Sequence, residues 1–375
     1  MPFRQISRRP ALMALPLIFL SSGLLATVLT GSSLASQHDV TDGPYVFAPD
    51  RKPDNASWIC HSEHKQTHID SPKVLRPENC GELPQPTLHE LKNTVEADSF
   101  SGVDTIVAFS DVHGQYDVMH TLLRNQGVID KDDNWALGKA HLVITGDMFD
   151  RGPQINEVLW LVYQLDKQAQ EAGGRLHLLM GNHEQMVLKG DLRYIHPRYK
   201  VTEELTDRKY DALYGTETEL GQWLRSKHTL VKINDMLFMH GGISPDWLET
   251  DLTISKANNL YREHIDTPKQ EIKQSELLNF LFYKNGPTWY RGYFKGKNML
   301  NEKQIDQLLA HFGVNHIVVG HTSQDRVLGR FNNKIIAIDS SIKRGESGEL
   351  LWVEDGKLSR GLYQGGKVSL TSDQD

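Results

Sequence analysis

Six short segments of this 375-residue chain carry side chains suited to binding divalent metal ions and phosphate. In chain order they are Asp111-Val-His113-Gly, Gly146-Asp147-Met-Phe-Asp150-Arg151-Gly, Gly181-Asn182-His183-Glu184, His240-Gly-Gly, Trp289-Tyr-Arg291-Gly and Gly320-His321. Two metal ions held by carboxylates and imidazoles can activate water and hydrolyse phosphate esters. One such segment is a weak signal, but six in a fixed order are hard to obtain by chance.

Glycines distinguish these segments from isolated polar residues at strand ends. A lone Asp or His there usually caps a turn or satisfies its own hydrogen bonds. We therefore assign no role to His141, His177, His196 and His316. Glycine permits tight turns and close approach of the backbone, as at Gly114, Gly146, Gly152, Gly181, Gly241 and Gly242. Converging acceptor groups would repel one another without a cation between them, which favours a metal site.

Runs of apolar, β-branched residues precede four of the segments and predict strands that end at them. These runs are 105–110, 141–145, 175–180 and 316–319. Amphipathic helices predicted at 117–125 and 156–172 give a β-α-β-α-β order, which implies parallel strands. In open α/β sheets, ligands bind at the carboxyl ends of the strands, so the polar side chains should meet there.

The remaining elements predict an α/β fold with mixed sheets flanked by helices, in an α/β/β/α sandwich. A hairpin turning at Asn234-Asp235 should lead directly into His240. A helix at 301–312 should begin after Asn301 as N-cap and end before Gly313. Further strands are expected at 334–339 and 350–354, and residues 185–228 should form a mostly helical rim near the site.

The segments resemble the phosphoprotein phosphatase family within the calcineurin-like metallophosphoesterases, whose pattern is GDxHG, GDxxDRG, GNHE, HGG and a late histidine. The resemblance covers roughly residues 104–345, and Ser110 replaces the first glycine of the pattern. The segment Gly286-Pro-Thr-Trp-Tyr-Arg-Gly292 is similar to the bacterial Shewanella-like group, some members of which prefer phosphotyrosine.

This resemblance implies two divalent metal ions (Mn, Fe or Zn) that share one carboxylate. The ligands of the first ion would be Asp111, His113, Asp147 and His321. The ligands of the second would be Asp147, Asn182 and His240. A hydroxide bridging the two metals would attack phosphorus directly, without a phosphoenzyme.

The other segment residues are expected to handle the substrate. His183 would protonate the leaving oxygen, and Asp150 would orient His183. Arg151 and Arg291 would bind the phosphoryl oxygens as forked donors, with Asn182 beside them.

Some of these roles have plainer alternatives. Arg291 could instead be a surface arginine stacked on Trp289 or Tyr290. Glu184 is expected to cap the following helix or support the site rather than bind a metal. Six aromatic residues could wall a deep substrate pocket or lie in the core: Tyr194, Tyr199, Tyr210, Trp223, Trp289 and Tyr290.

Residues 1–35 are expected to be an export signal peptide, which would place the mature protein in the periplasm. Three arginines precede the apolar residues 11–30, and Ser33-Leu34-Ala35 offers a cleavage site. The apolar stretch is also long enough for a membrane anchor, but Ser21-Ser22-Gly23 interrupts it and favours cleavage, with no stable membrane insertion afterwards. Ser7-Arg8-Arg9 partly matches a twin-arginine signal, an alternative export route.

Residues 36–100 are expected to form an extended arm on the catalytic domain of residues 101–375. Cys60 and Cys80 are the two cysteines of the chain, and in an exported protein they should form a disulfide. A metal site with the nearby histidines is the alternative, although the spacing fits no standard zinc pattern.

Charge and motifs together limit the substrate classes. The net charge is -7, and the three arginines of residues 1–35 leave -7 - 3 = -10 for the remainder. An acidic body argues against nucleic acid as a partner. We expect a phosphorylated protein or peptide as substrate, with phosphotyrosine favoured over phosphoserine and phosphothreonine. The alternatives are a dinucleoside polyphosphate hydrolase or phosphodiesterase, a non-specific phosphate-scavenging phosphatase, and a binding protein with a degenerate site.

Overall fold

The computed structural model describes residues 39–70, 74–89, 95–294 and 299–372. The predicted signal peptide, residues 1–35, lies outside the described residues. Within the described part of the chain, no helix combines the length and apolar character needed to cross a bilayer.

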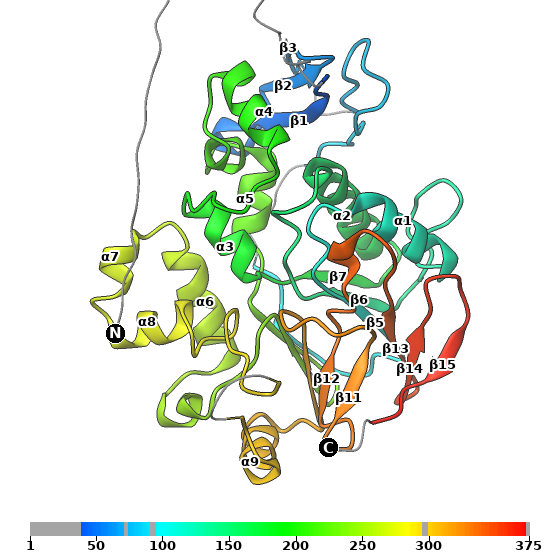
Figure 1. Ribbon diagram of the computed structural model, residues 1–375, viewed down its shortest axis with the longest axis vertical. Coiled ribbons are helices and arrows are strands. Elements are labelled where there is room, and N and C mark those ends of the chain that lie inside the picture. The colour runs from blue at the N-terminus through cyan, green and yellow to red at the C-terminus, as the bar shows by residue number, and fades with distance from the viewer. Residues whose placement is uncertain (1–38, 71–73, 90–94, 295–298, 373–375) are drawn as a thin grey trace, which may run out of the picture. The chain divides into compact units, whose positions relative to one another are not determined.

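The first of two six-stranded mixed sheets carries the predicted β-α-β-α-β unit (Figure 1). Its strands are, in spatial order, β15 (Lys367–Ser369), β14 (Lys357–Gly361), β13 (Leu350–Glu354), β5 (Thr105–Phe109), β6 (His141–Ile144) and β7 (Arg175–Leu178). The last three are parallel, as expected from the crossovers between them, whereas β13 pairs antiparallel with β5.

The second sheet carries the hairpin and the late strands. Its spatial order is β11 (Leu328–Arg330), β12 (Ile335–Ala337), β10 (His316–Val319), β9 (Met236–Met239), β8 (Leu230–Ile233) and β4 (Ser99–Phe100). Strands β8 and β9 form the predicted antiparallel hairpin, and β10 runs parallel to both β9 and β12. The carboxyl ends of β9, β10 and β12 therefore reach one edge of this sheet.

The two sheets pack face to face, because alternate side chains of each strand point to opposite faces. Between the sheets lies a buried cluster that includes Ile106, Ala108, Val143, Phe238, Val318, Ile336 and Leu351. The intervening residues Val107 and Phe109 instead join the cluster that the helices cover. This arrangement confirms the expected α/β/β/α sandwich.

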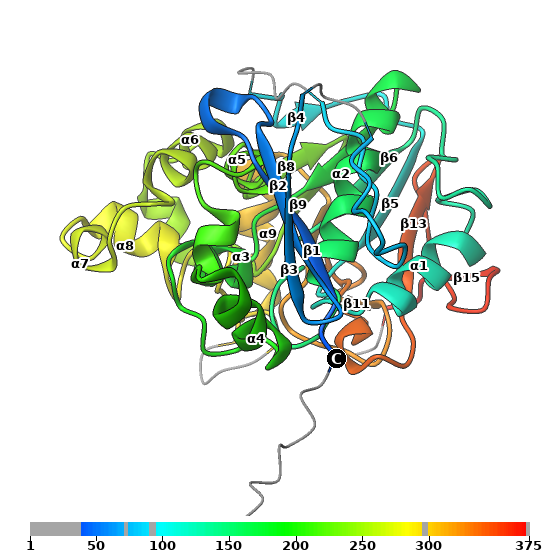
Figure 2. The same cartoon turned by 90° about the horizontal axis from the view of Figure 1, so that it is seen from above.

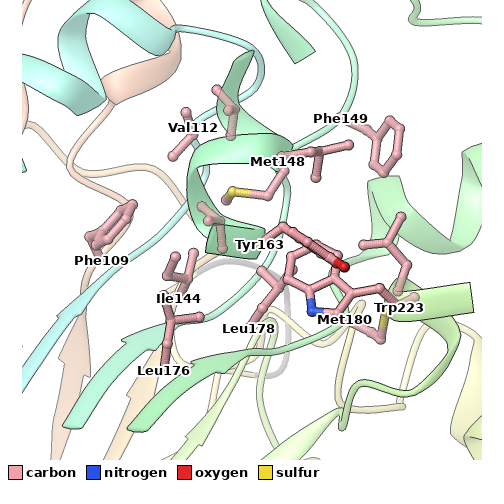
Figure 3. Close-up of a cluster of buried hydrophobic side chains, with 14 of the residues drawn as sticks. Phe109, Val112, Ile144, Met148, Phe149, Tyr163, Leu176, Leu178, Met180 and Trp223 are labelled. Atoms are coloured by element: carbon pink, nitrogen blue, oxygen red, sulfur yellow. The ribbon is translucent and has the colours of Figure 1, made fainter. Parts of the chain in front are cut away.

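Helices cover the outer faces of both sheets. The predicted helices appear as α1 (Tyr116–Asn125) and α2 (Ile155–Glu171), and α2 packs on β7. Figure 3 shows Ile144, Leu176 and Leu178 of the parallel strands in one apolar cluster with Tyr163 of α2. The other helices are α3 (Asn182–Leu188), α4 (Arg198–Thr206), α5 (Glu219–Arg225), α6 (Ile254–His264), α7 (Lys269–Ile272), α8 (Glu276–Phe282) and α9 (Glu302–Phe312).

Short 3-10 helices connect these elements, and α9 has the ends that the sequence predicts. The Asn301 side chain accepts a hydrogen bond from the backbone N of Gln304 (3.0 Å), and Gly313 ends the helix in the left-handed conformation (φ 59°). The 3-10 helices are η1 (Pro49–Arg51), η2 (Asp211–Tyr214), η3 (Pro245–Glu249) and η4 (Ile342–Arg344).

The segment expected as an extended arm instead forms a separate antiparallel sheet. Its strands are β1 (Asp42–Phe47), β2 (Asn55–Cys60) and β3 (Glu63–His68). Strand β1 contacts α2 and α5, and the other two strands contact α4 (Figure 2). Cys60 and Cys80 form a disulfide with Cα atoms 5.8 Å apart, so they do not serve as metal ligands.

A buried carboxylate fastens this small sheet to the helices. Asp42 is 1% exposed and accepts hydrogen bonds from Asn156 of α2 (2.9 Å), Thr202 of α4 (2.6 Å) and Tyr45 of its own strand (2.7 Å). A buried carboxylate is stable only when such donors replace water. The small sheet is therefore part of the packed body and not a loosely attached arm.

Candidate metal centre and active site

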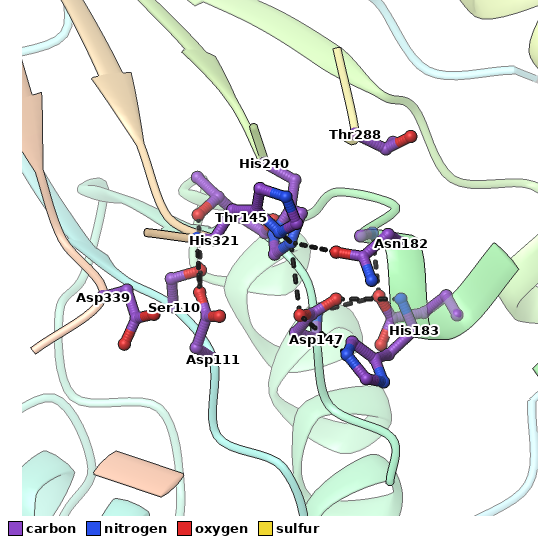
Figure 4. A network of polar contacts seen from close by, with 12 residues as sticks. Ser110, Asp111, Thr145, Asp147, Asn182, His183, His240, Thr288, His321 and Asp339 are labelled. Atoms are coloured by element: carbon purple, nitrogen blue, oxygen red, sulfur yellow. Dashed lines mark hydrogen bonds and ion pairs between the residues drawn. The ribbon is translucent and has the colours of Figure 1, made fainter. Parts of the chain in front are cut away.

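The predicted site residues follow the carboxyl ends of parallel strands from both sheets. Asp111 follows β5, Asp147 follows β6, Asn182 and His183 follow β7, His240 follows β9, and His321 follows β10. All six side chains are buried, and Figure 4 shows them converging on one small volume. The structure thus brings together residues separated by more than two hundred positions in the sequence.

Backbone strain is concentrated in these loops. The left-handed conformation, with φ between 51° and 69°, occurs at Asp111, His113, Asp147, Asp150, Arg151 and His321. A residue with a Cβ in such a conformation costs about 1–3 kcal/mol and persists only where its surroundings enforce it. The strain aims these side chains inward at the point where the chain leaves each strand.

Asp147 lies at the centre of the cluster. Its Oδ2 atom is 3.2 Å from His240 Nε2, 3.5 Å from His113 Nε2 and 3.8 Å from His183 Nε2. Two groups of possible ligands, each with its atoms within 4.8 Å of one another, share this carboxylate. The groups are His113-Asp147-His183 and Asp147-His240-His321. A carboxylate common to two groups has the position required of a bridging ligand.

Glycine makes the central position of Asp147 possible. A Cβ atom at Gly181 would collide with the Oδ1 and backbone N of Asp147. The same Oδ1 accepts a hydrogen bond from the backbone N of His183 (3.0 Å), so one carboxylate oxygen is held by α3. Oδ2 remains directed toward the histidines.

The second ligand group lies around His240. His240 Nε2 is 3.0 Å from Asn182 Oδ1 and 3.1 Å from His321 Nδ1, while His240 Nδ1 lies 2.8 Å from the Thr145 carbonyl. His113 has the same arrangement, with Nδ1 2.6 Å from the Phe149 carbonyl. A carbonyl on one ring nitrogen fixes the tautomer and leaves the other nitrogen free to bind a metal.

Asp111 is held by two donors on one of its oxygens. Oδ2 accepts hydrogen bonds from Ser110 Oγ (2.6 Å) and from the backbone N of His321 (2.9 Å). Ser110 Oγ in turn accepts one from Thr145 Oγ1 (2.8 Å). The other oxygen, Oδ1, faces His113, with 3.9 Å between Oδ1 and Nε2. Ser110, which departs from the family pattern, therefore orients a predicted metal ligand.

The electrostatics of the cluster fit a bound cation. Burial, reinforced by nearby Asp339, raises the pKa of Asp111 to about 8. Burial alone would lower the pKa of His240, but the charge of Asp147 outweighs it and raises that pKa to about 9. Several buried carboxylates in so small a volume are costly without positive charge, and the mixed oxygen and imidazole donors suit divalent transition metals.

Beside the ligands lies a histidine–carboxylate pair. His183 Nδ1 is 2.5 Å from Asp150 Oδ2, and both side chains are buried. Burial tends to lower the pKa of His183, but Asp147 and Asp150 together raise it. Its Nε2 atom lies 3.4 Å from Arg151 Nη2, whose Nε is 3.3 Å from His113 Nε2. An imidazole held in this way can deliver a proton next to a guanidinium.

Arg291 contributes a second guanidinium on the opposite ligand. It donates from Nη1 to the His321 carbonyl (2.5 Å), and its Nη2 lies 3.3 Å from His321 Nδ1. Arg291 therefore contacts the metal-ligand loop, which favours a role in the site over the surface-stacking alternative. Glu184 supports the site as expected, accepting from the backbone N atoms of Asp147 (2.8 Å), Met148 (2.7 Å) and Gly181 (2.8 Å).

Sequence reasoning missed Asp339, which lies beside Asp111 in Figure 4. Asp339 follows β12, is fully buried, and accepts hydrogen bonds from the backbone N of Ser341 (3.1 Å) and from Lys343 Nζ (3.2 Å). The strand before it was predicted, but the segment lacks the neighbouring glycines of the other motifs. Its position at the end of a parallel strand was the available signal.

Comparisons with known proteins agree with this geometry. The calcineurin-like phosphoesterase family model matches residues 105–325. Among solved structures, a cold-active protein-tyrosine phosphatase from a psychrophilic Shewanella species is 56% identical, with a TM-score of 0.85. The match covers 88% of this chain and 100% of that one.

Two curated relatives extend the comparison to eukaryotes. A protein of Schizosaccharomyces pombe is 32% identical over 255 residues, covering 65% of this chain and 75% of the relative. Shewanella-like protein phosphatase 1 of Plasmodium berghei is 28% identical over 244 residues, covering 63% of this chain and 67% of the relative.

Proposed function

The chain belongs to the calcineurin-like phosphoesterase family, and we propose that it hydrolyses phosphate monoesters on proteins, phosphotyrosine in particular. The observation that carries this proposal is the pair of buried ligand groups sharing Asp147, with the His183-Asp150 pair and Arg151 beside them. The 56% identity to a Shewanella protein-tyrosine phosphatase supports phosphotyrosine as the favoured ester. Phosphoserine and phosphothreonine are the weaker candidates.

The residues present fit two divalent ions. Asp111, His113, Asp147 and His321 would hold one, and Asp147, Asn182 and His240 the other. When bound, such ions polarise the ester and activate the attacking water. Manganese, iron and zinc all accept this donor set, and we favour manganese for the test below because it is a borderline-hard ion that suits mixed oxygen and imidazole donors.

The chain's own residues supply the remaining chemistry. Asp150 accepts from Nδ1 of His183, so Nε2 can present a proton to the leaving oxygen of the ester. General acid assistance of this kind accelerates a reaction by about 10²–10⁴-fold. Arg151 and Arg291 approach the site from opposite sides and would bind the phosphoryl oxygens, lowering the repulsion between ester and carboxylates.

Substrate comparison tests this function. The protein reconstituted with manganese is assayed on one peptide carrying phosphotyrosine, phosphoserine or phosphothreonine at the same position, and on a phosphodiester and diadenosine tetraphosphate. We expect the highest kcat/KM on the phosphotyrosine peptide. Activity confined to the diester or tetraphosphate would overturn the protein-phosphatase assignment, and equal activity on all monoesters would favour a scavenging phosphatase.

We further propose export to the periplasm, with cleavage after the first 35 residues. The basic and apolar amino terminus and the Cys60–Cys80 disulfide support this proposal, because disulfides persist in oxidising compartments. Amino-terminal sequencing of the protein recovered from a bacterial periplasmic fraction tests it. A start near Ser36 is expected, whereas an intact amino terminus in the membrane fraction would show an anchor instead.

A further inference from the structure

The six aromatic residues that could wall a pocket separate clearly by burial. Tyr199, Tyr210 and Trp223 lie in the apolar core and cannot contact a substrate. Trp289 and Tyr290 are partly buried. Tyr194 is 46% exposed, and it is the one aromatic residue among the exposed large hydrophobic side chains of the described residues. An exposed aromatic ring of this size invites a functional explanation when it lies beside a site.

Tyr194 lies against the proton donor and the phosphate-binding arginine. Its ring centroid is 5.7 Å from that of His183, at an interplanar angle of 49°. The guanidinium carbon of Arg151 lies 5.7 Å from the same centroid, and that of Arg193 lies 5.4 Å away. The ring is therefore lined by two cations, and a large part of it remains open.

The backbone fixes this ring relative to the catalytic loop. The Tyr194 carbonyl accepts a hydrogen bond from the backbone N of Arg151 (2.9 Å). Upstream, the backbone N of Asp191 donates to the Met186 carbonyl (2.8 Å), and the Asp191 carboxylate binds Arg193 through two hydrogen bonds (2.9 and 2.6 Å). A platform tied to the loop that binds phosphate loses little conformational entropy when a substrate meets it.

The leaving group must occupy this side of the site. His183 delivers its proton to the oxygen that departs, so the carbon skeleton attached to that oxygen lies near His183. We propose that Tyr194 is a specificity-determining residue whose ring stacks on the phenyl ring of a phosphotyrosine substrate. This inference rests on the function proposed above and deepens it, because a serine or threonine side chain has no ring to stack.

Matched variants test the platform. Tyr194→Ala should lower kcat/KM on the phosphotyrosine peptide by about 3- to 10-fold, mainly through KM, because ring stacking is present before and during the reaction. The same variant should leave kcat/KM on the matched phosphoserine peptide and inhibition by inorganic phosphate unchanged. Tyr194→Phe should behave like the wild type, since it keeps the ring. Tyr363→Ala, which removes a tyrosine remote from the site, is the control.

The outcomes distinguish this inference from the proposed function. If Tyr194→Ala retains the wild-type phosphotyrosine preference, the inference is wrong while the function stands. An equal loss on both peptides together with weaker inhibition by phosphate would show that Tyr194 acts through Arg151 and not on the substrate ring. A wild-type enzyme without phosphotyrosine preference would overturn the proposed function and the inference together. The thermal midpoint of each variant is measured alongside, and an exposed site predicts little change.

Discussion

Asp150 Oδ2 lies 2.5 Å from His183 Nδ1, while Oδ1 of the same carboxylate has no hydrogen-bond partner among the described residues. A buried carboxylate oxygen without a donor is costly, so this pair is held by the site and not by general packing. Its geometry turns His183 Nε2 toward Asp147 and Arg151. The pair therefore leads directly to a test of proton donation.

His183→Asn should lower kcat according to how much the leaving group needs a proton. We expect a loss of about 10²–10⁴-fold on an alkyl phosphate and a much smaller loss on p-nitrophenyl phosphate, whose leaving group is stable as an anion. The ratio of the two kcat values in wild type and variant gives the answer. Equal losses on both substrates would contradict the role of His183 as a proton donor.

Asp147→Asn should empty or weaken both metal positions, because Asp147 belongs to both ligand groups. Turnover should fall by at least about 10³-fold, since positioning and charge stabilisation are both lost. Metal content after manganese loading and dialysis is the direct measurement, with the exposed Asp132→Asn as control. A variant with full metal content and full activity would be incompatible with a shared bridging carboxylate.

Ser110→Ala should weaken manganese binding without unfolding the protein. It removes one of the two donors to Asp111 Oδ2 and leaves the Thr145 hydroxyl without its acceptor. Loss of a group that orients a metal ligand typically costs about 10- to 100-fold in affinity. Calorimetric titration of manganese into metal-free protein measures the change. Ser57→Ala, at a buried serine in β2, is the control, and identical titrations for both variants would refute this positioning role.

Glu219 should make stability fall as pH rises. Burial raises its pKa to about 7, and its Oε1 accepts from Tyr163 OH (2.6 Å). Because this exceeds the unfolded value of 4.5, the folded state binds more protons between the two values, and the free energy of unfolding declines as pH increases through that window. Relative to Glu219→Gln, the wild type should lose about 2 kcal/mol between pH ~5 and ~8.

Denaturant unfolding of wild type and Glu219→Gln at the two pH values checks this expectation. The change in the difference between them matters, since the substitution also has a pH-independent effect on packing. Glu217→Gln, at the exposed neighbouring position, is the control. A difference that stays constant with pH would show that Glu219 is ionised in the folded protein at low pH.

Asp42→Ala should destabilise the whole protein and not only the small sheet. The substitution leaves the side chains of Asn156, Thr202 and Tyr45 without their common acceptor, at a cost of about 3–5 kcal/mol. Urea unfolding should show a lower midpoint in a single transition. A surface control is Asp70→Ala. Separate melting of the small sheet with an unchanged main transition would argue that the two parts fold independently.

The sequence predicted the site well because each motif combines a strand, a glycine turn and a polar residue in one short window. The parallel strands, the hairpin before His240 and the Asn301 cap all depend on such local patterns. Asp339 escaped because its importance comes from its proximity to Asp111, which only the folded sheets create. The burial of Tyr199 and exposure of Tyr194 likewise depend on tertiary packing.

The small sheet escaped for a related reason. Strand β3 is mostly exposed, with a polar sequence that shows no alternation of apolar residues. Its pairing depends on β2, and β1 is secured by helices more than a hundred residues away in the chain. Composition alone therefore indicated an irregular arm, whereas long-range hydrogen bonds produce a sheet.

The grip of Arg198 and Tyr199 on the Pro153 carbonyl has a consequence for protein engineering. Arg198 Nη1 and Tyr199 OH each donate to that carbonyl (both 2.7 Å), and Arg198 also donates to the carbonyl of Thr41, immediately before β1. The loop bearing Asp150 and Arg151 is thus clamped from the amino-terminal strand. A transplantable catalytic module would have to include this strand, so chimaeras cut at the edges of the family match would inherit the ligands but not the brace that holds their arginine.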